Sequence, residues 1–525
     1  MFPFARKASG LVKTVSTKDS IVGNLLVLNV VFMSLTMIWL PSTFPGGDMV
    51  LATLLTFPGA LCLAIVYVLF GVALPRSGGD YVFVSRSLHP AVGFVGNFSF
   101  YFWMPVWFAW MAAWFTQTGL SAMFTMMGFM TNNAGFSAMG ATLGEPIWIF
   151  VIGTIVSLVA ALVTISGVKK GLNLMWVTFV IAIVGVMLSV FLVAANSPAT
   201  YTAAFDRYAS SSDVISAAAG TGYFPTGIAW NDFGATLKMV PLLALVLTWP
   251  MLSIYVASEL KEAKRNIPIG VLGALVIGTI LLALVGWTIT SVIGNELMGS
   301  VTLVDWAAPA AYPFPVVPSY LMFSSLLTNS VPLLLLMGIG TAVWGFANLL
   351  YEYIITPRMV LAWAFDRIFP KKFAEVSPRF HTPIPAIILT FGLTEVFLLI
   401  YVYIPNVVLF FGSMMFVYAI IYAILGISAI VFPFRRKDLY KGSPADIKVA
   451  GIPLMAIFGV GTVVFMVWLI YMFLSDAAYL LNSTTGLIGV GFSFVLGIVI
   501  YIIAHLVRKK QGISLGMVYK EIPPD

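Results

Sequence analysis

Long apolar stretches separated by short polar segments run through the whole chain. A helix that crosses a lipid bilayer needs about 20 mostly apolar residues. Runs of that kind lie at 22–43, 49–74, 90–125, 146–166, 172–195, 234–260, 266–294, 331–365, 384–403, 405–433, 450–474 and 485–507. The pattern predicts an all-α integral membrane protein with twelve transmembrane helices. The run at 90–125 is too long for one perpendicular helix, so we expect it to tilt or to extend past the membrane.

The composition supports lipid as the solvent of this chain. Of the 525 residues, 60% are hydrophobic and only 9% are charged. An ordinary soluble domain is about 45–50% apolar and about 25% charged. A water-soluble fold could not bury this much apolar surface.

The basic residues predict the orientation of the helices. If the N-terminus is cytoplasmic, all of the 27 Lys and Arg residues except Arg207 and Lys238 fall on the cytoplasmic side or in the two tails. Cytoplasmic loops of membrane proteins carry such an excess. We therefore attribute the net charge of +7 to the orientation of the helices in a cell membrane, with both termini cytoplasmic. We do not attribute it to a surface that binds nucleic acid.

Motifs for energy-coupled or hydrolytic chemistry are missing from the sequence. The chain has no G-x-x-x-x-G-K-[ST] loop, no H-E-x-x-H and no G-x-S-x-G motif, and its three histidines and single cysteine, Cys62, form no ligand cluster. We therefore expect neither an enzyme nor a metal or other cofactor. Transport by such a chain would run on gradients rather than on ATP.

A proline interrupts the apolar run at 234–260. Pro250 follows Thr248 and Trp249 in the middle of this run, and it removes a backbone donor and clashes with the preceding turn. In lipid, the freed backbone groups must face protein or a water-filled cavity. Interrupted helices in corresponding positions of two halves indicate a transporter site, so these three residues are candidates for substrate binding. The alternative is a simple proline kink.

The first apolar run offers a second candidate break. Its middle reads Ser34-Leu35-Thr36-Met37, and the two hydroxyls could support an opened turn that binds substrate. They could equally bond to carbonyls of an intact helix. In the third run, which is crowded with aromatic residues, Asn97 or Trp103 is expected to line the same pocket.

Two sets of charged residues suggest coupling and gating. Glu352 lies in the middle of an apolar run, with Asn348 one turn earlier; an acid there is costly unless it is neutral or faces the protein interior, so the pair is a candidate proton-coupling site. A structural role is the alternative, and it is the role we expect for Glu395.

The second set lies at the inner end of the sixth run. Glu259 and Lys261 are candidates for an inner gate, with Glu259 pairing with Arg76 or Arg86. An ordinary charged cluster at the membrane surface is the alternative.

Four segments resemble the amino acid permeases of the amino acid–polyamine–organocation superfamily. "PRSGGDYVFVSRSLHPAVGF" at 75–94 resembles the segment after the second span, and "ASELKEAKRNIP" at 257–268 the end of the sixth. "RMVLAWAFDRIFP" at 358–370 is similar to the end of the eighth span, and "SPRFHTPIPA" at 377–386 to the entry of the ninth. They occur in the family's order, and the resemblance covers about residues 20–505.

The resemblance implies a fold of two inverted five-helix repeats, with discontinuous helices one and six, plus two peripheral helices. The corresponding divisions are a cytoplasmic tail at 1–20, a transport core at 21–435, two further helices at 436–507 and a tail at 508–525. It also implies a substrate held between spans one, three, six, eight and ten. Its carboxylate would meet backbone amides of span one and its ammonium the carbonyls of span six, which the polarity of helix ends favours.

The expected function is a secondary active permease that imports amino acids or related amines by alternating access, with protons or alternatively sodium as the coupling ion. The glycines of span one in the family are replaced by Ser34 to Ile38, and the acid late in span two by Leu69. Losing glycines hinders close backbone approach. A transporter of the same fold for a nucleobase or an organic acid therefore remains open, as does a membrane sensor or channel.

Overall fold

The computed structural model is mostly helical. It describes residues 10–224, 227–404, 413–515 and 519, and for Val30, Phe32, Met33 and Leu35 it describes the backbone alone. Within these residues the one sheet is a small antiparallel pair, β1 (Lys448–Val449) with β2 (Ile452–Pro453), in which Lys448 lies opposite Pro453.

Ten helical segments of the described chain are long and apolar enough to cross a membrane. The first five are α3 (Met49–Ala73), α8 (Pro146–Ile165), α9 (Val168–Ala194), α12 (Phe233–Leu247) with the 3-10 helix η2 (Leu252–Glu259), and α13 (Ala263–Thr288) with the π-helix η3 (Ile289–Ile293). The others are α16 (Val331–Ile355) with α17 (Pro357–Phe365), α18 (Ile384–Tyr403), α20 (Ser413–Arg435), α22 (Leu454–Ser475) and α23 (Thr484–Lys510).

Two of the twelve expected spans are not among these ten. The run at 22–43 forms two short helices, α1 (Thr17–Leu28) and α2 (Val30–Thr43). The run at 90–125 forms α5 (Pro90–Trp114), which is long enough at 25 residues but contains four tryptophans as well as Asn97 and Tyr101. It continues through the π-helix η1 (Phe115–Ser121) into α6 (Ala122–Thr131). Residues 405–412, the start of the expected tenth span, lie outside the described residues.

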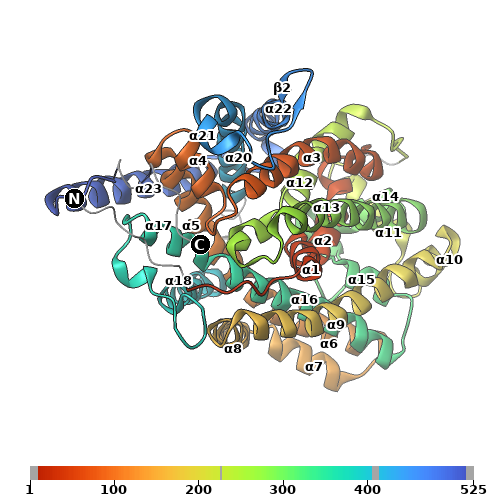
Figure 1. Ribbon diagram of the computed structural model, residues 1–525. Coiled ribbons are helices and arrows are strands. Elements are labelled where there is room, and N and C mark those ends of the chain that lie inside the picture. Colours follow the sequence, from red (N-terminus) through yellow and green to blue (C-terminus); the bar gives the residue numbers. More distant parts are fainter. Residues whose placement is uncertain (1–9, 225–226, 405–412, 516–518, 520–525) are drawn as a thin grey trace.

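Shorter elements gather at the two ends of the molecule (Figure 1). One end carries α10 (Pro198–Phe205), α11 (Ser211–Gly220), α14 (Asn295–Ala307) and α15 (Tyr320–Ser325). The other carries α4 (Asp80–Ser87) and α17, with the last turns of α23. The remaining short elements are α7 (Ala134–Leu143), η4 (Pro309–Ala311), η5 (Lys371–Ala374), α21 (Lys437–Tyr440) and η6 (Ala477–Tyr479).

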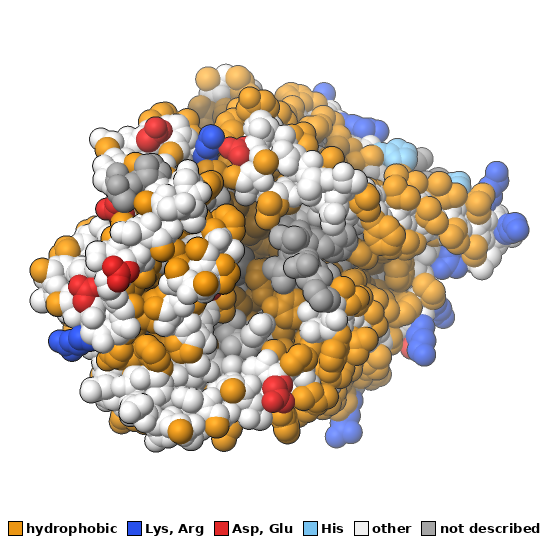
Figure 2. All heavy atoms as spheres, turned by 180° about the vertical axis from the view of Figure 1, so that it is seen from behind, with side chains coloured by type: hydrophobic (Ala, Val, Ile, Leu, Met, Phe, Trp, Pro, Cys, Tyr) orange, Lys and Arg blue, Asp and Glu red, His pale blue; other side chains and the backbone are white. Residues whose placement is uncertain are grey.

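The surface has the polarity of a membrane protein. Figure 2 shows apolar side chains over the middle of the molecule and most of the visible Lys and Arg side chains at one end. Exposed apolar residues include Phe191, Val464 and Ile488, each more than 60% accessible. Lipid contact accounts for such exposure, which would be costly in water.

Close helix crossings hold α16 in place beside α1 and α9. A Cβ atom at Gly185 of α9 would lie 2.4 Å from the Leu336 carbonyl oxygen of α16, and one at Gly23 of α1 would lie 2.1 Å from the Tyr351 ring. Glycine at both positions lets the backbones approach, as is common between membrane helices. The consequence is that one face of α16 is pressed against α1, where the candidate site lies.

Candidate functional site

The first helix break is a single residue, Asn29. It adopts the left-handed conformation, with φ 53° and ψ 75°, and its backbone N–H donates to the Leu26 carbonyl. Asparagine tolerates this conformation better than most residues because its short polar side chain bonds locally. The chain therefore ends α1 at Leu28 and starts α2 at Val30 along a new direction.

The second break follows Leu247, at the end of α12. Thr248 to Met251 separate α12 from η2, and Val256 inside η2 is itself non-helical, with φ −110° and ψ 26°. Pro250 has no N–H, so in a continuous helix the Val246 carbonyl would have no donor. The bond that would normally stabilise this turn is thus missing.

A small cavity lies between the two breaks. It measures about 10 Å³, room for about one water molecule. It is lined by Val27, Leu28 and Asn29 at the first break, Leu245, Val246 and Trp249 at the second, Trp107 of α5, Glu352 of α16 and Met414 of α20. Both breaks therefore border the same space.

Glu352 is the acid of this cavity, and it is only 1% exposed. Its Oε1 accepts from Asn348 Nδ2 at 3.4 Å, and Asn348 Nδ2 also donates to the Leu26 carbonyl at 2.9 Å. Trp107 Nε1 donates to Asn348 Oδ1 at 3.2 Å. Within the described residues, Glu352 Oε2 has no hydrogen-bond partner. The structure thus places Glu352 beside the first break, where Asn348 contacts both the acid and the Leu26 carbonyl.

The prediction of an opened turn at Ser34 to Met37 is wrong. These residues lie inside α2, where Ser34 Oγ donates to the Val31 carbonyl at 2.6 Å. A hydroxyl that bonds back to its own turn leaves the helix intact. Met37 is fully buried, and the side chains of Leu35 and its neighbour Met33 lie outside the described residues.

Ser34 lines a second cavity of about 20 Å³ instead, and Thr36 lines neither cavity. The second cavity is bordered by hydroxyl side chains from five helices and one loop position, namely Ser34, Thr118, Ser189, Ser319, Tyr320 and Thr341, with Val31, Trp114, Val186 and Leu321. It is separate from the cavity between the breaks. The hydroxyl pattern of the first apolar run therefore marks a neighbouring space rather than the break itself.

Three further predicted pocket residues serve other contacts. Thr248 Oγ1 donates to the Ala244 carbonyl at 2.8 Å. Asn97 Nδ2 donates to Asp80 Oδ1 at 3.1 Å, and Asn97 Oδ1 accepts from Trp363 Nε1 at 2.8 Å. Trp103 is fully buried and does not line the cavity, whereas Trp107, one turn later on α5, does. Trp249 and Pro250 lie at the second break, as predicted.

The inner gate residues pair differently from the prediction. Glu259 forms a two-bond ion pair with Arg358 of α17: Nε to Oε1 at 2.8 Å and Nη2 to Oε2 at 3.1 Å, with both side chains at most 1% exposed. Glu259 therefore does not pair with Arg76 or Arg86. Arg76 donates to the Pro75 carbonyl, and the Lys261 side chain is exposed.

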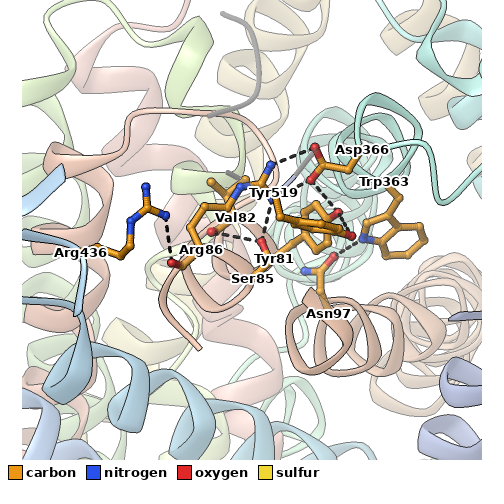
Figure 3. A network of polar contacts seen from close by, with 9 residues as sticks. All are labelled: Tyr81, Val82, Ser85, Arg86, Asn97, Trp363, Asp366, Arg436 and Tyr519. Atoms are coloured by element: carbon orange, nitrogen blue, oxygen red, sulfur yellow. Dashed lines mark hydrogen bonds and ion pairs between the residues drawn. The ribbon is translucent and has the colours of Figure 1, made fainter. Parts of the chain in front are cut away.

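Arg86 forms a second buried pair, with Asp366 just after α17. Its Nη1 and Nη2 lie 2.6 and 2.9 Å from the Asp366 oxygens, and Tyr81 donates to the same carboxylate at 2.7 Å. Figure 3 shows this group with Tyr519 beside it, and the Tyr519 ring lies 4.9 Å from the guanidinium. Two ion pairs thus tie α17 to η2, and Asp366 just after α17 to α4.

A fourth buried acid, Asp80, lies on α4, outside the candidate membrane spans. Burial raises the pKa of its carboxyl to about 6, and hydrogen bonds from Tyr255 and Asn97 lower it in part. The folded protein therefore binds this proton more tightly than the unfolded chain does.

This raised pKa predicts a pH-dependent stability. The Asp80 contribution should be fully present below about pH 4 and lost as the pH rises through about 6, a change of about 3 kcal/mol for two pKa units. Thermal unfolding in detergent between pH 4 and 8 measures it, with Asp80→Asn as the reference. The stability difference between the two proteins should vary with pH across this window; parallel curves would contradict the assignment.

One comparison with known proteins decides the family. The family described as "amino acid permease" matches residues 21–504. The chain belongs to the amino acid permease family. A comparison with curated protein sequences gave no significant match. The resemblance carried by the four motifs is thus confirmed, and the protein is a multi-pass membrane protein of a transporter family.

Sequence reasoning missed three residues of the candidate site and of the ion pair at Glu259. Asn29 interrupts the apolar stretch "LLVLNVVFM" of the first run, and a strongly polar residue at such a place is a usable signal for a break. Arg358 follows a proline at the end of an apolar run, so its burial with Glu259 had no sequence signal. Trp107 could not be told from the other aromatic residues of α5 without the packing.

Proposed function

We propose that this permease is a secondary transporter that moves amino acids or related amines across the membrane by alternating access, coupled to protons through Glu352. The observation that carries the proposal is the cavity shared by both helix breaks and by α5, α16 and α20. Those elements correspond to spans one, three, six, eight and ten of two inverted five-helix repeats, which we propose as the core at 21–435. Such sites lie near the membrane midplane at interrupted helices.

The polarity of the two breaks suits a zwitterion. α2 begins at Val30, so its N-terminal end points its partial positive charge at the cavity, and α12 ends at Leu247 with its partial negative charge there. A carboxylate would be favoured at the first end and an ammonium at the second. The nine lining residues are otherwise mostly apolar, which favours a substrate with an apolar side chain.

The conformation of the molecule supports alternating access. The cavity between the two helix breaks, here called the central cavity, is too small for an amino acid. The ion pairs Glu259–Arg358 and Arg86–Asp366 close one end of the molecule. The N-terminal segment adds to this closure, since Val15 N–H donates to the Glu259 carbonyl at 3.1 Å. Substrate exchange at this end requires both pairs to separate.

The basic end is proposed to face the cytoplasm. Excess Lys and Arg on one face orients membrane proteins with that face inside, and most of the visible basic side chains lie at the end closed by the two pairs (Figure 2). Both tails, 1–20 and 508–525, would then be cytoplasmic, in a plasma membrane protein. We propose coupling to protons rather than to sodium because the cavity presents one buried carboxyl group, that of Glu352, which can carry a proton.

A transporter of a different solute, such as a nucleobase or an organic acid, is the second candidate. Its support is the first break itself, where Leu28 and Asn29 carry side chains beside the cavity. Side chains there narrow the approach of a carboxylate to the backbone.

Uptake into proteoliposomes tests the proposal. The purified permease is reconstituted, and labelled leucine, phenylalanine, uracil and succinate are offered with and without an imposed pH step, with protein-free vesicles as the control. We expect saturable accumulation of an amino acid that depends on the pH step. Uptake of uracil or succinate alone would favour the second candidate, and a linear, non-saturating flux would indicate a channel. Binding of a solute without flux would indicate a sensor.

A further inference from the structure

The central cavity offers more acceptors than donors to a ligand. Among the described residues that line it, Glu352 is the one charged side chain, and none of them is Lys, Arg or His. Its Oε2 is buried and without a partner among the described residues. An unpaired carboxylate oxygen in such a site needs a proton or a cation.

The side-chain donors nearest to Glu352 are already engaged. Trp107 Nε1 donates to Asn348, and Asn348 Nδ2 donates to the Leu26 carbonyl. Asn29 Nδ2 donates to the Met111 sulfur at 3.2 Å. The amides and indole around this acid are thus committed to holding the first break, not to binding an anion.

The opposite wall of the cavity also suits a cation. Val246 lines it, and Pro250 deprives the Val246 carbonyl of its usual helical donor. The indoles of Trp107 and Trp249 line it as well, and aromatic faces attract ammonium groups. Trp249 is fixed there by Tyr418, whose ring centroid is 4.8 Å away.

We infer that Glu352 Oε2 binds the ammonium group of the substrate, and that this ammonium and a proton occupy the oxygen alternately. This inference rests on the proposed function and names its substrate class, a primary amine with a small apolar side chain, for which a carboxylate is not required. The O–H bond of the acid breaks as the ammonium arrives, and the proton leaves to water. On the other side the ammonium leaves and a proton returns.

Exchange follows from this alternation. A carboxylate with neither proton nor amine would be an uncompensated charge in a closed cavity, and such a charge costs several kcal/mol. The permease would therefore change sides only when Glu352 holds one of the two. This predicts one proton moved against each amine, and not the symport expected from the sequence.

Other ionisable groups around α16 do not replace Glu352. Tyr418 of α20 is close enough to be affected by the Glu352 charge. Asp19 of α1 accepts from Trp176 of α9, Glu395 of α18 accepts from Thr154 of α8, and Glu259 is paired with Arg358 of α17. None of these carboxylates lines the cavity.

Equilibrium binding of three matched probes tests the inference. Isoamylamine is leucine without its carboxylate, and isocaproate is leucine without its ammonium. We expect purified permease to bind labelled isoamylamine, with unlabelled leucine competing and isocaproate not competing. As the pH falls, the isoamylamine Kd should rise by up to tenfold per unit once the proton competes. In weakly buffered solution, binding should release up to one proton per amine.

Variants separate Glu352 from other acids. Glu352→Gln should weaken isoamylamine binding at least about 30-fold and abolish proton release, as expected when one partner of a buried charge pair is removed. Glu352→Asp should retain proton release. The matched control is Glu395→Gln, which changes an intramembrane acid away from the cavity and should leave both readouts unchanged. Cooperative thermal unfolding checks that each variant is folded.

Several results would overturn the inference. They are displacement by isocaproate, absence of isoamylamine binding, proton uptake instead of release, or unchanged affinity in Glu352→Gln. If Glu352→Gln does not fold, the wild-type protein still tests the inference. A Kd for isoamylamine that does not change with pH would overturn it. Saturable, pH-driven leucine uptake together with any of these results would leave the proposed function standing, whereas absence of uptake would remove both.

Discussion

Replacing Pro250 by Ala is expected to reduce solute uptake at least about tenfold while raising thermal stability. Alanine supplies the N–H that proline lacks and removes the ring that clashes with the preceding turn. The Val246 carbonyl can then accept a helical bond, worth about 0.5–1.5 kcal/mol. A continuous helix through Thr248 to Met251 would withdraw the polar backbone from the cavity. Uptake and thermal unfolding of the same preparation measure the two effects.

Pro58→Ala is the matched control. Pro58 also lies inside a membrane helix, α3, but its side chain is exposed on the lipid side and the helix runs through it from Met49 to Ala73. This variant should leave uptake unchanged. Full uptake in Pro250→Ala would show that the break is held by packing of Trp249 or is not needed for transport.

The second large effect is expected at the Glu259–Arg358 pair. Glu259→Gln leaves the Arg358 charge buried without its carboxylate, and breaking a buried pair in this way typically costs about 3–5 kcal/mol. We therefore expect a strong fall in the midpoint of thermal unfolding. The double variant Glu259→Leu with Arg358→Met should recover most of the loss, because it removes both charges and fills the space with apolar atoms.

The exposed pair Arg436–Asp438 provides the comparison. Its atoms are 2.9 Å apart, but the Asp438 side chain is 62% exposed, and such surface pairs contribute about 0–1 kcal/mol. Asp438→Asn should barely move the unfolding midpoint. An equally small effect of Glu259→Gln would mean that the inner pair does not hold the closed end together.

Much of the fold could be predicted because lipid imposes a simple length rule. The apolar runs located the ten long helical segments, with boundaries that shift by a few residues, as for 172–195 against Val168–Ala194. The length rule fails where a helix is interrupted or contains many aromatic side chains. Asn29 splits the first run into helices too short to qualify, and the tryptophans of α5 are amphipathic.

The site was predicted in its chemistry better than in its geometry. Pro250 and Glu352 could be proposed from the sequence because a helix breaker and an acid are both costly in lipid. Ser34 and Thr36 led to the wrong prediction of an opened turn. A hydroxyl inside a helix can donate to a backbone carbonyl of the same helix, and the sequence does not show this bond. The partners of Glu259 and Arg86 depend on how α17 crosses η2 and α4, a tertiary arrangement with no local signal.

The account depends on a solute being held between Asn29 and Trp249. An experimental structure of the permease determined with saturating isoamylamine or leucine tests this most directly. We predict density for the solute in an enlarged central cavity, with its ammonium within hydrogen-bond distance of Glu352 and both helix breaks still open. A solute bound elsewhere, with α12 continuous through Pro250 or with Glu352 packed away from the solute, would contradict it.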